Sequence, residues 1–166
     1  IYNIWYRKMR NLFKSLVIEE NPDGSFSSSI KKKSVEDLPI GELLIKVSYS
    51  SLNYKDALSF SGNKGVTKSY PHTPGIDAVG IVENSETEKF KIGDEVIVSG
   101  FDLGMNTSGG FGQYIRVPNK WACHLPNGLS ALDSMAIGTA GLTAGLSAYE
   151  LKKLNGIEGR EAVITG

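Results

Sequence analysis

The sequence predicts an α+β protein that is mainly β, in which a small barrel or sandwich of strands precedes a helical part. Two observations predict this class. Up to Pro118, short apolar or alternating segments recur between clusters of Gly, Pro, Asn and Asp, as in proteins built from many short strands. Near Ser130 the composition changes to Ala, Leu, Ser and Met at helical spacing.

The first fifty residues indicate three strands. Phe13–Glu20 alternates weakly and meets the turn cluster Asn21–Gly24, where Pro presets one turn dihedral angle and Gly accepts a positive φ. The next segments are expected to be a returning strand, a connector and a strong β-branched strand: Ser25–Lys33, Val35–Pro39 and Leu43–Tyr49.

The middle of the chain mixes one short helix with further strands. Asn53–Phe60 has helix-compatible residues for about two turns and ends at Ser61-Gly62-Asn63. After it we expect two strands, Ala78–Val82 and Gly93–Val98, with an exposed loop of charged residues, Glu83–Lys91, between them. A glycine-rich loop and one more strand follow, at Phe101–Gly112 and Gln113–Val117.

The two ends of the chain are harder to interpret. Ala131–Leu154 indicates two helices that meet at Gly138–Gly141, and the final segment Glu161–Gly166 indicates an apolar strand that stops on glycine. Such a strand can enter the phosphate turn of a dinucleotide fold, although an ordinary strand meeting a turn is the commoner cause. Residues 1–11 form an N-terminal extension that either precedes the natural start or packs as an arm.

Composition limits the partners and the compartment. Eighteen basic and eighteen acidic residues cancel, so we expect neither nucleic acid nor an anionic membrane as a partner, and a small molecule as the substrate. The single cysteine, Cys123, excludes an internal disulfide and a thiolate metal cluster, and we expect it to fill the core. No stretch approaches a membrane span or a secretory signal, so the expected location is cytoplasmic.

Five ordered motifs carry a family resemblance. They are Ser51-Leu52-Asn53-Tyr54-Lys55-Asp56-Ala57, Pro74-Gly75-Ile76-Asp77-Ala78-Val79-Gly80, Gly93-Asp94-Glu95-Val96, Gly109-Gly110-Phe111-Gly112-Gln113-Tyr114 and Ile137-Gly138-Thr139-Ala140-Gly141-Leu142-Thr143-Ala144. In this order and spacing they resemble the medium-chain dehydrogenase/reductase superfamily, in the zinc-free quinone oxidoreductase and acryloyl-CoA reductase branch.

The resemblance implies a domain division and a cofactor. Residues 12–130 would form the GroES-like substrate domain, and residues 131–166 would form linking helices and the first strand of an incomplete Rossmann domain. The implied cofactor is NADPH, whose phosphates need a glycine turn and helix beyond this chain. Related enzymes commonly dimerise through the Rossmann sheet, so a homodimer is expected only of a full-length protein.

Zinc is not expected. Alcohol dehydrogenases of this superfamily bind catalytic zinc with a Cys near the position of Asn53 and a His-Glu pair after the glycine at Gly75. This chain has Ile76-Asp77 in place of that pair, no Cys near Asn53, and one cysteine where a structural zinc site would need four. The resemblance therefore implies metal-free chemistry, with no metal ligands.

The resemblance also places the site residues. Hydride would pass from the nicotinamide to the β-carbon of an activated double bond while hydrogen-bond donors hold the developing enolate oxygen. Tyr54, Asn53 and Asp56 would be catalytic, and Thr139, Tyr54 and Gly166 would contact the cofactor. Each of the first three also has a structural explanation: Asn53 as a helix cap, Tyr54 as packing, and Asp56 as a first-turn acid.

Three functions follow in order of preference. The first is the N-terminal part of an NADPH-dependent reductase of enoyl thioesters or quinones, inactive as this chain alone. The second is a non-enzymatic GroES-like module whose closing strand, Ala162–Thr165, pairs with a partner. The third, part of a zinc alcohol dehydrogenase, conflicts with the missing ligands.

Overall fold

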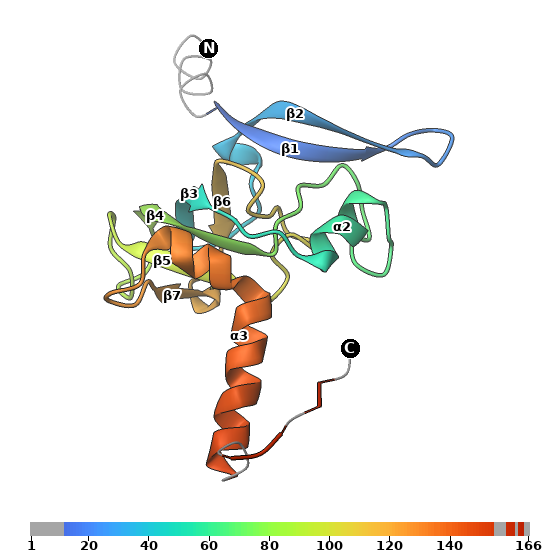
Figure 1. Cartoon of the computed structure of the whole chain (residues 1–166). Helices are drawn as coiled ribbons and strands as arrows, with labels where there is room; N and C mark the ends of the chain where they lie inside the picture. The colour runs from blue at the N-terminus through green and yellow to red at the C-terminus, as the bar shows by residue number, and fades with distance from the viewer. Residues whose placement is uncertain (1–11, 155–158, 162, 165–166) are drawn as a thin grey trace.

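The computed structural model describes residues 12–154, 159–161 and 163–164 and shows the expected α+β fold, mainly β (Figure 1). The elements are, in order, β1 (Leu12–Glu20), β2 (Phe26–Ser34), the 3-10 helix η1 (Val35–Asp37), β3 (Leu43–Tyr49), α2 (Tyr54–Phe60), β4 (Asp77–Ser85), β5 (Glu95–Ser99), β6 (Tyr114–Val117), the 3-10 helix η2 (Asn119–Trp121), β7 (Ala122–His124) and α3 (Ala131–Lys153).

The strands form two antiparallel sheets. β1 and β2 form a hairpin, and the other five strands pair in the order β6-β3-β4-β5-β7. Backbone hydrogen bonds hold the hairpin to the remainder of the barrel, because Ile18 pairs with His72 and the N–H of Leu16 donates to the carbonyl of Phe111. The hairpin therefore lies across the top of the larger sheet in Figure 1.

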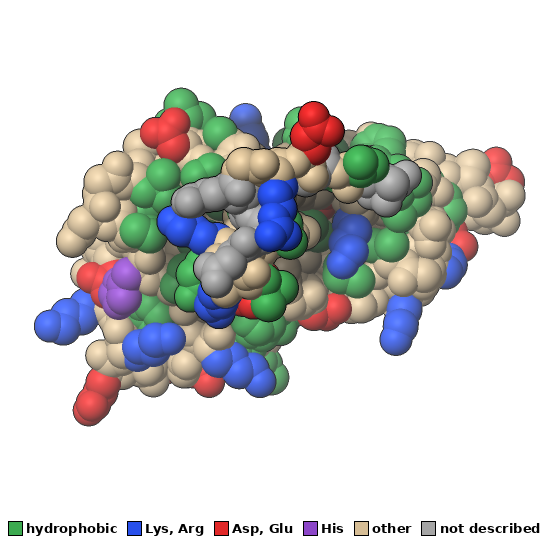
Figure 2. Space-filling view, turned by 60° about the horizontal axis from the view of Figure 1, so that its bottom comes forward, with side chains coloured by type: hydrophobic (Ala, Val, Ile, Leu, Met, Phe, Trp, Pro, Cys, Tyr) green, Lys and Arg blue, Asp and Glu red, His purple; other side chains and the backbone are tan. Residues whose placement is uncertain are grey.

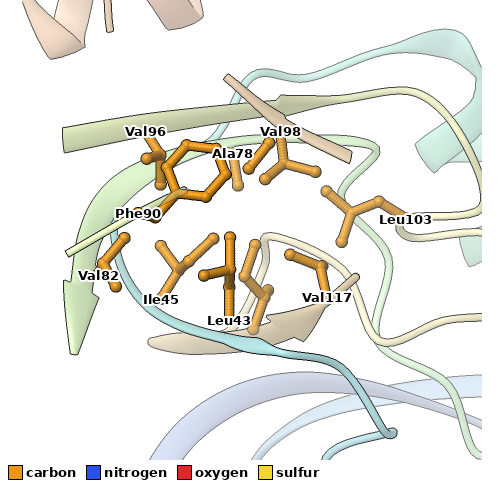
Figure 3. Packing of buried hydrophobic residues seen from close by; sticks show 11 residues of the cluster. Leu43, Ile45, Ala78, Val82, Phe90, Val96, Val98, Leu103 and Val117 are labelled. Atoms are coloured by element: carbon orange, nitrogen blue, oxygen red, sulfur yellow. The ribbon is translucent and has the colours of Figure 1, made fainter. Parts of the chain in front are cut away.

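The core is enclosed by the five-stranded sheet. Figure 3 shows apolar side chains of β3, β4, β5 and β6 pointing toward one another, and the same cluster includes Phe90 and Leu103 from loops. The strands alternate between the two faces, so that one side chain in two points inward, for example Leu43 and Ile45 on β3. Burial of this cluster is the main stabilising contribution to the barrel.

Helix α3 consists of two segments, as the sequence predicts. Gly138 interrupts it with φ 52° and ψ −164°, a conformation open almost only to glycine. The first segment packs on the barrel through Ser134 and Met135, and the second projects away from it (Figure 1). Every residue from Leu142 to Leu154 is exposed, and Figure 2 shows hydrophobic and basic side chains mixed on the face from which α3 projects.

Three local predictions differ from the structure. Strand β4 extends to Ser85, and Phe90, within the loop expected to be exposed, is 1% exposed because it enters the core. Strand β7 was not foreseen. Within it Ala122 faces the core, and the alternation of a strand turns Cys123 outward, so the cysteine is exposed rather than core filler.

The expected terminal strand is not seen in its described residues. Glu161, Val163 and Ile164 have no strand assignment, and the two apolar side chains are more than 90% exposed. A parallel strand needs neighbours to satisfy its backbone groups, and the described residues supply none beside this segment. Ala162, Thr165, Gly166 and residues 1–11 lie outside the described part. Among the helices that the structure describes, none is long and apolar enough to cross a membrane.

Candidate functional site

A single buried carboxylate binds two of the predicted site residues, Asn53 and Thr139. Asp77, the first residue of β4, is 0% exposed. Its Oδ2 accepts hydrogen bonds from Ser51 Oγ at 2.6 Å, Asn53 Nδ2 at 2.9 Å and the Thr139 backbone N–H at 2.9 Å. Its Oδ1 accepts from Thr139 Oγ1 at 2.6 Å. We call this group, Ser51, Asn53, Asp77 and Thr139, the Asp77 cluster.

Three separate segments build the Asp77 cluster. The loop after β3 is held over β4 because Ser50 Oγ donates to the backbone carbonyl of Asp77 at 2.6 Å. The kink in α3 brings Thr139 against the same carboxylate, and a Cβ added to Gly138 would lie 2.9 Å from Ser51 Oγ and 3.2 Å from Asp77 Oδ2. Only glycine fits between the helix and the loop at this point.

The environment of Asp77 keeps it ionised. Burial alone would raise the pKa of its carboxyl group, but hydrogen bonds from Ser51 and Thr139, with a contribution from Ser99, outweigh burial, and the pKa lies below its usual value. The cluster therefore carries one negative charge at neutral pH, which N–H and O–H donors stabilise by hydrogen bonding.

Asp56 has a different environment from Asp77. It is 3% exposed, and its carboxylate accepts the backbone N–H groups of Asn53 at 2.9 Å, Gly75 at 2.9 Å and Ile76 at 3.0 Å. Burial raises its pKa, although the same N–H groups lower it in part. The side chain joins the start of α2 to the loop before β4, which is a positioning arrangement. A catalytic part for Asp56 stays a prediction.

Tyr54 opens α2 and faces solvent. It is 79% exposed, and its hydroxyl makes no hydrogen bond within the described part of the chain. The structure thus brings Asn53 and Thr139 into one cluster and places Tyr54 directly after Asn53 at its edge. Gly166, expected to contact the cofactor, lies outside the described residues. The catalytic and cofactor-binding roles of these residues stay predictions.

Sequence reasoning missed Asp77 as a site residue. The Ile76-Asp77 pair was interpreted only as the loss of zinc ligands. A signal was present, since Asp77 begins a strand that is otherwise apolar, Ala78-Val79-Gly80-Ile81-Val82. A carboxylate in such a strand must find hydrogen-bond donors elsewhere in the fold.

The described residues fit the nicotinamide end of a dinucleotide better than its phosphates. The exposed Tyr54 ring offers a flat surface for a neutral ring such as nicotinamide. The helix terminus at Thr139 cannot receive a phosphate because the Asp77 carboxylate already occupies it. For metals, no three His, Cys, Asp or Glu side chains of residues 12–154 and the described residues after them gather closely enough to hold an ion.

Comparison with known proteins identifies related chains. The family described as alcohol dehydrogenase GroES-like domain matches residues 39–127. The acrylyl-CoA reductase of Ruegeria pomeroyi is 41% identical over 142 residues, 85% of this chain and 43% of that protein. The quinone oxidoreductase of Sus scrofa is 32% identical over 71% of this chain and 36% of its own length. The chain spans about half the length, or less, of these curated relatives.

Two solved structures have a similar fold. The YhdH oxidoreductase of Salmonella enterica in complex with NADP has a TM-score of 0.81 and 39% identity, over 84% of this chain and 43% of that chain. The Bacillus subtilis protein YhfP with NAD bound also has a TM-score of 0.81, with 41% identity over 90% of this chain and 44% of that chain. Both of those proteins bind a nicotinamide dinucleotide.

Proposed function

The chain belongs to the alcohol dehydrogenase GroES-like domain family, within the medium-chain dehydrogenase/reductase superfamily, and we propose that it supplies the substrate domain of an NADPH-dependent reductase of activated double bonds. The observation that carries this proposal is the meeting of Asn53 and Thr139, from segments far apart in the sequence, at one buried carboxylate with Tyr54 exposed beside them. Two residues that the superfamily resemblance selects, Asn53 and Thr139, therefore bind the same carboxylate, which supports the proposal.

The proposed acceptor is an enoyl thioester of the acryloyl-CoA type or a quinone. Support comes from the relatives, one named an acrylyl-CoA reductase and another a quinone oxidoreductase. Both acceptors place a carbon–carbon double bond beside a carbonyl group, so that a hydride added at the β-carbon leaves negative charge on the carbonyl oxygen. A common site could therefore reduce either class.

NADPH, when bound, would supply the hydride. The residues of this chain would then have to stabilise the enolate oxygen and return a proton to the α-carbon. Tyr54 is the proposed donor, because its hydroxyl is exposed and uncommitted among the described residues, whereas one N–H of Asn53 and both Thr139 donors already bind Asp77. Asn53 and Thr139 would hold the loop after β3 and the kink of α3 in place around Asp77, with Thr139 beside the nicotinamide.

We propose that the reaction uses no metal. What supports this is the chemistry of the residues at the candidate site, where an amide, an aliphatic side chain and a hydroxyl stand at Asn53, Ile76 and Thr139. None of these is a zinc ligand of the common kind. The carboxylate of the Asp77 cluster uses its oxygens to accept four hydrogen bonds. Activity that survives a strong chelator is the expected result.

The projecting segment of α3 supports a second domain. From Thr139 to Tyr149 it has no charged residue, and its larger apolar side chains, Leu142, Leu146 and Tyr149, lie on one face of the helix and are each more than half exposed. An apolar stripe of this kind is usually buried against another part of the protein. We propose that a dinucleotide-binding domain covers it and holds the cofactor phosphates, that a full-length protein forms a homodimer, and that it acts in the cytoplasm.

The experiment is an NADPH oxidation assay of the full-length protein encoded by the reading frame that contains this chain. Acryloyl-CoA and a benzoquinone serve as acceptors. Tyr54→Phe removes only the hydroxyl, and we expect it to lower kcat by roughly 10²-fold, a common effect of losing a general acid, with a smaller change in the KM for NADPH. Tyr49→Phe is the matched control, because Tyr49 is also exposed but lies on β3.

Two results would overturn the proposal. One is the absence of NADPH oxidation with both acceptors in a folded protein. The other is a terminus at Gly166 together with partner binding by the chain itself, which would favour the interaction module. Tight NADPH binding by this chain alone would separately contradict the expected need for a phosphate site elsewhere, and titration followed by tryptophan fluorescence measures it.

A further inference from the structure

The second segment of α3, residues 139–153, has no N-cap residue of its own. The preceding residue is Gly138, which has no side chain and a left-handed φ of 52°. The first N–H groups of any helix lack partners within the helix. Here the Thr139 N–H donates to Asp77 Oδ2 at 2.9 Å, so a residue of strand β4 takes the place of the missing cap.

The contact is stronger than a single capping bond. Thr139 Oγ1 donates to the other oxygen of the same carboxylate at 2.6 Å, so both Asp77 oxygens bind one helical residue. From the barrel side, Ser51 and Asn53 donate to Oδ2 and hold the carboxylate in place. A carboxylate at this end also interacts favourably with the positive end of the helix dipole.

Little else connects this segment to the barrel. Within the described part of the chain, no other hydrogen bond joins residues 139–153 to a strand. On one flank, Leu142 faces an open pocket that Trp121 and Leu129 also line, so tight packing does not restrain the segment there. The two bonds at Thr139 are therefore the last polar connection before the helix enters solvent.

We propose that Asp77 is the anchor that fixes the direction of the second α3 segment relative to the barrel, and with it the separation of Asn53 from Thr139. The segment is about 22 Å long at 1.5 Å per residue, so a rotation of about 10° at Thr139 would move its far end by roughly 4 Å. In the proposed reductase, Asp77 is a positioning residue that keeps Asn53 and Thr139 at a fixed separation. That consequence depends on the proposed function, whereas the anchoring does not.

The test measures the distance between the helix and the barrel directly. Spin labels are attached at Glu83→Cys on β4 and Lys152→Cys near the end of α3, both exposed positions, in a Cys123→Ser background that removes the exposed native thiol. Double electron–electron resonance then gives the distance distribution in this chain. The Asp77→Asn substitution keeps the shape of the side chain but removes its negative charge and one of its two acceptor oxygens. We expect the distance between the two spin labels in the Asp77→Asn variant to be more widely distributed or to shift. The change should be roughly 4 Å for each 10° by which the second α3 segment rotates.

The matched control is Asp133→Asn, which removes an exposed carboxylate from the first turn of α3 instead, and should leave the distribution unchanged. Circular dichroism establishes that each variant is folded. A folded Asp77→Asn variant with an unaltered distribution would overturn the proposal. If Asp77→Asn does not fold, the Thr139→Val variant replaces it in the test, because this substitution removes only the hydrogen bond to Asp77 Oδ1. An unaltered distance distribution in a folded Thr139→Val variant would also overturn the proposal. No cofactor or acceptor is needed, so failure of the reductase assay leaves this test intact.

Discussion

The backbone N–H of Thr139 lies 2.9 Å from the carboxylate of Asp77, although 62 positions in the sequence separate the two residues. This contact joins the start of β4 to the kink of α3 and brings a helix terminus, a buried charge and two loop side chains into one cluster. The first two predictions concern this cluster, and the other two concern the barrel that carries it.

Asp77→Asn should destabilise the chain most strongly near neutral pH. The pKa of Asp77 is lowered in the folded state, so its contribution is complete above its unfolded value near 3.8 and is lost as pH falls through the folded pKa. We expect a loss of about 2 to 4 kcal/mol in the free energy of unfolding at pH 7, because hydrogen bonds to a buried charge are lost. Urea unfolding over a pH series should show this difference shrinking in acid. A difference independent of pH would contradict the assignment.

Gly138→Ala should destabilise the chain, whereas Gly145→Ala should not. The new Cβ at 138 would meet Ser51 Oγ at 2.9 Å and force a positive φ on alanine. Strain of this kind costs about 1 to 3 kcal/mol. At 145 nothing lies within 4 Å, and alanine in a helix is favoured over glycine by about 1 kcal/mol. Unfolding followed by the helical circular dichroism signal at 222 nm should show a lower free energy of unfolding for Gly138→Ala and an equal or higher one for Gly145→Ala. Equal changes in the two variants would argue against the kink at Gly138.

His72 should make the stability fall as pH drops below its unfolded value near 6.5. Burial lowers the pKa of His72, with Lys33 adding to the effect, so the folded state keeps the ring neutral while the unfolded chain takes up a proton. His72→Gln, which retains an N–H for the carbonyl of Gly104, should flatten the dependence between pH 7.5 and about 5.5. Equal slopes in the unmodified protein and in His72→Gln would refute this assignment.

Phe90→Ala should cost about 3 to 5 kcal/mol in the free energy of unfolding, the usual range for truncating a buried aromatic side chain. Phe90 is 1% exposed and lies within the core cluster in Figure 3. The control is Phe60→Ala, because Phe60 is 47% exposed at the end of α2, and its loss should be within about 1 kcal/mol. Urea denaturation measures both. Similar losses would mean that Phe90 does not fill the core.

Local patterns in the sequence predict most of the elements. Leu43–Tyr49 was expected as a strand and has those ends in the structure, because β-branched and apolar residues in alternation fit a half-buried pleated surface. The hairpin turn after β1, the short helix α2 and the interruption of α3 near Gly138 were expected for the same kind of reason. Proline, glycine and capping residues act on the backbone within a few positions, so one stretch of sequence contains all the information needed.

The superfamily resemblance could also be identified from the sequence, because five motifs in order are visible without coordinates. It selected five residues, and the structure shows that two of them, Asn53 and Thr139, share one carboxylate. The other three are Tyr54, Asp56 and Gly166. The resemblance could not show that the hydrogen-bond donors of Asn53 and Thr139 already bind Asp77. That depends on distances between segments which no local pattern encodes.

By itself the sequence determined the class of fold, the order of most of its elements and the family, since these depend on short-range periodicity, turn chemistry and motif order. Tertiary structure decided that Phe90 leaves a charged loop for the core, that Cys123 faces outward, and that Asp77 rather than Asp56 binds the helix at Thr139. The physical reason is that a buried charge or ring is stable only with partners around it, and these partners come from distant parts of the chain.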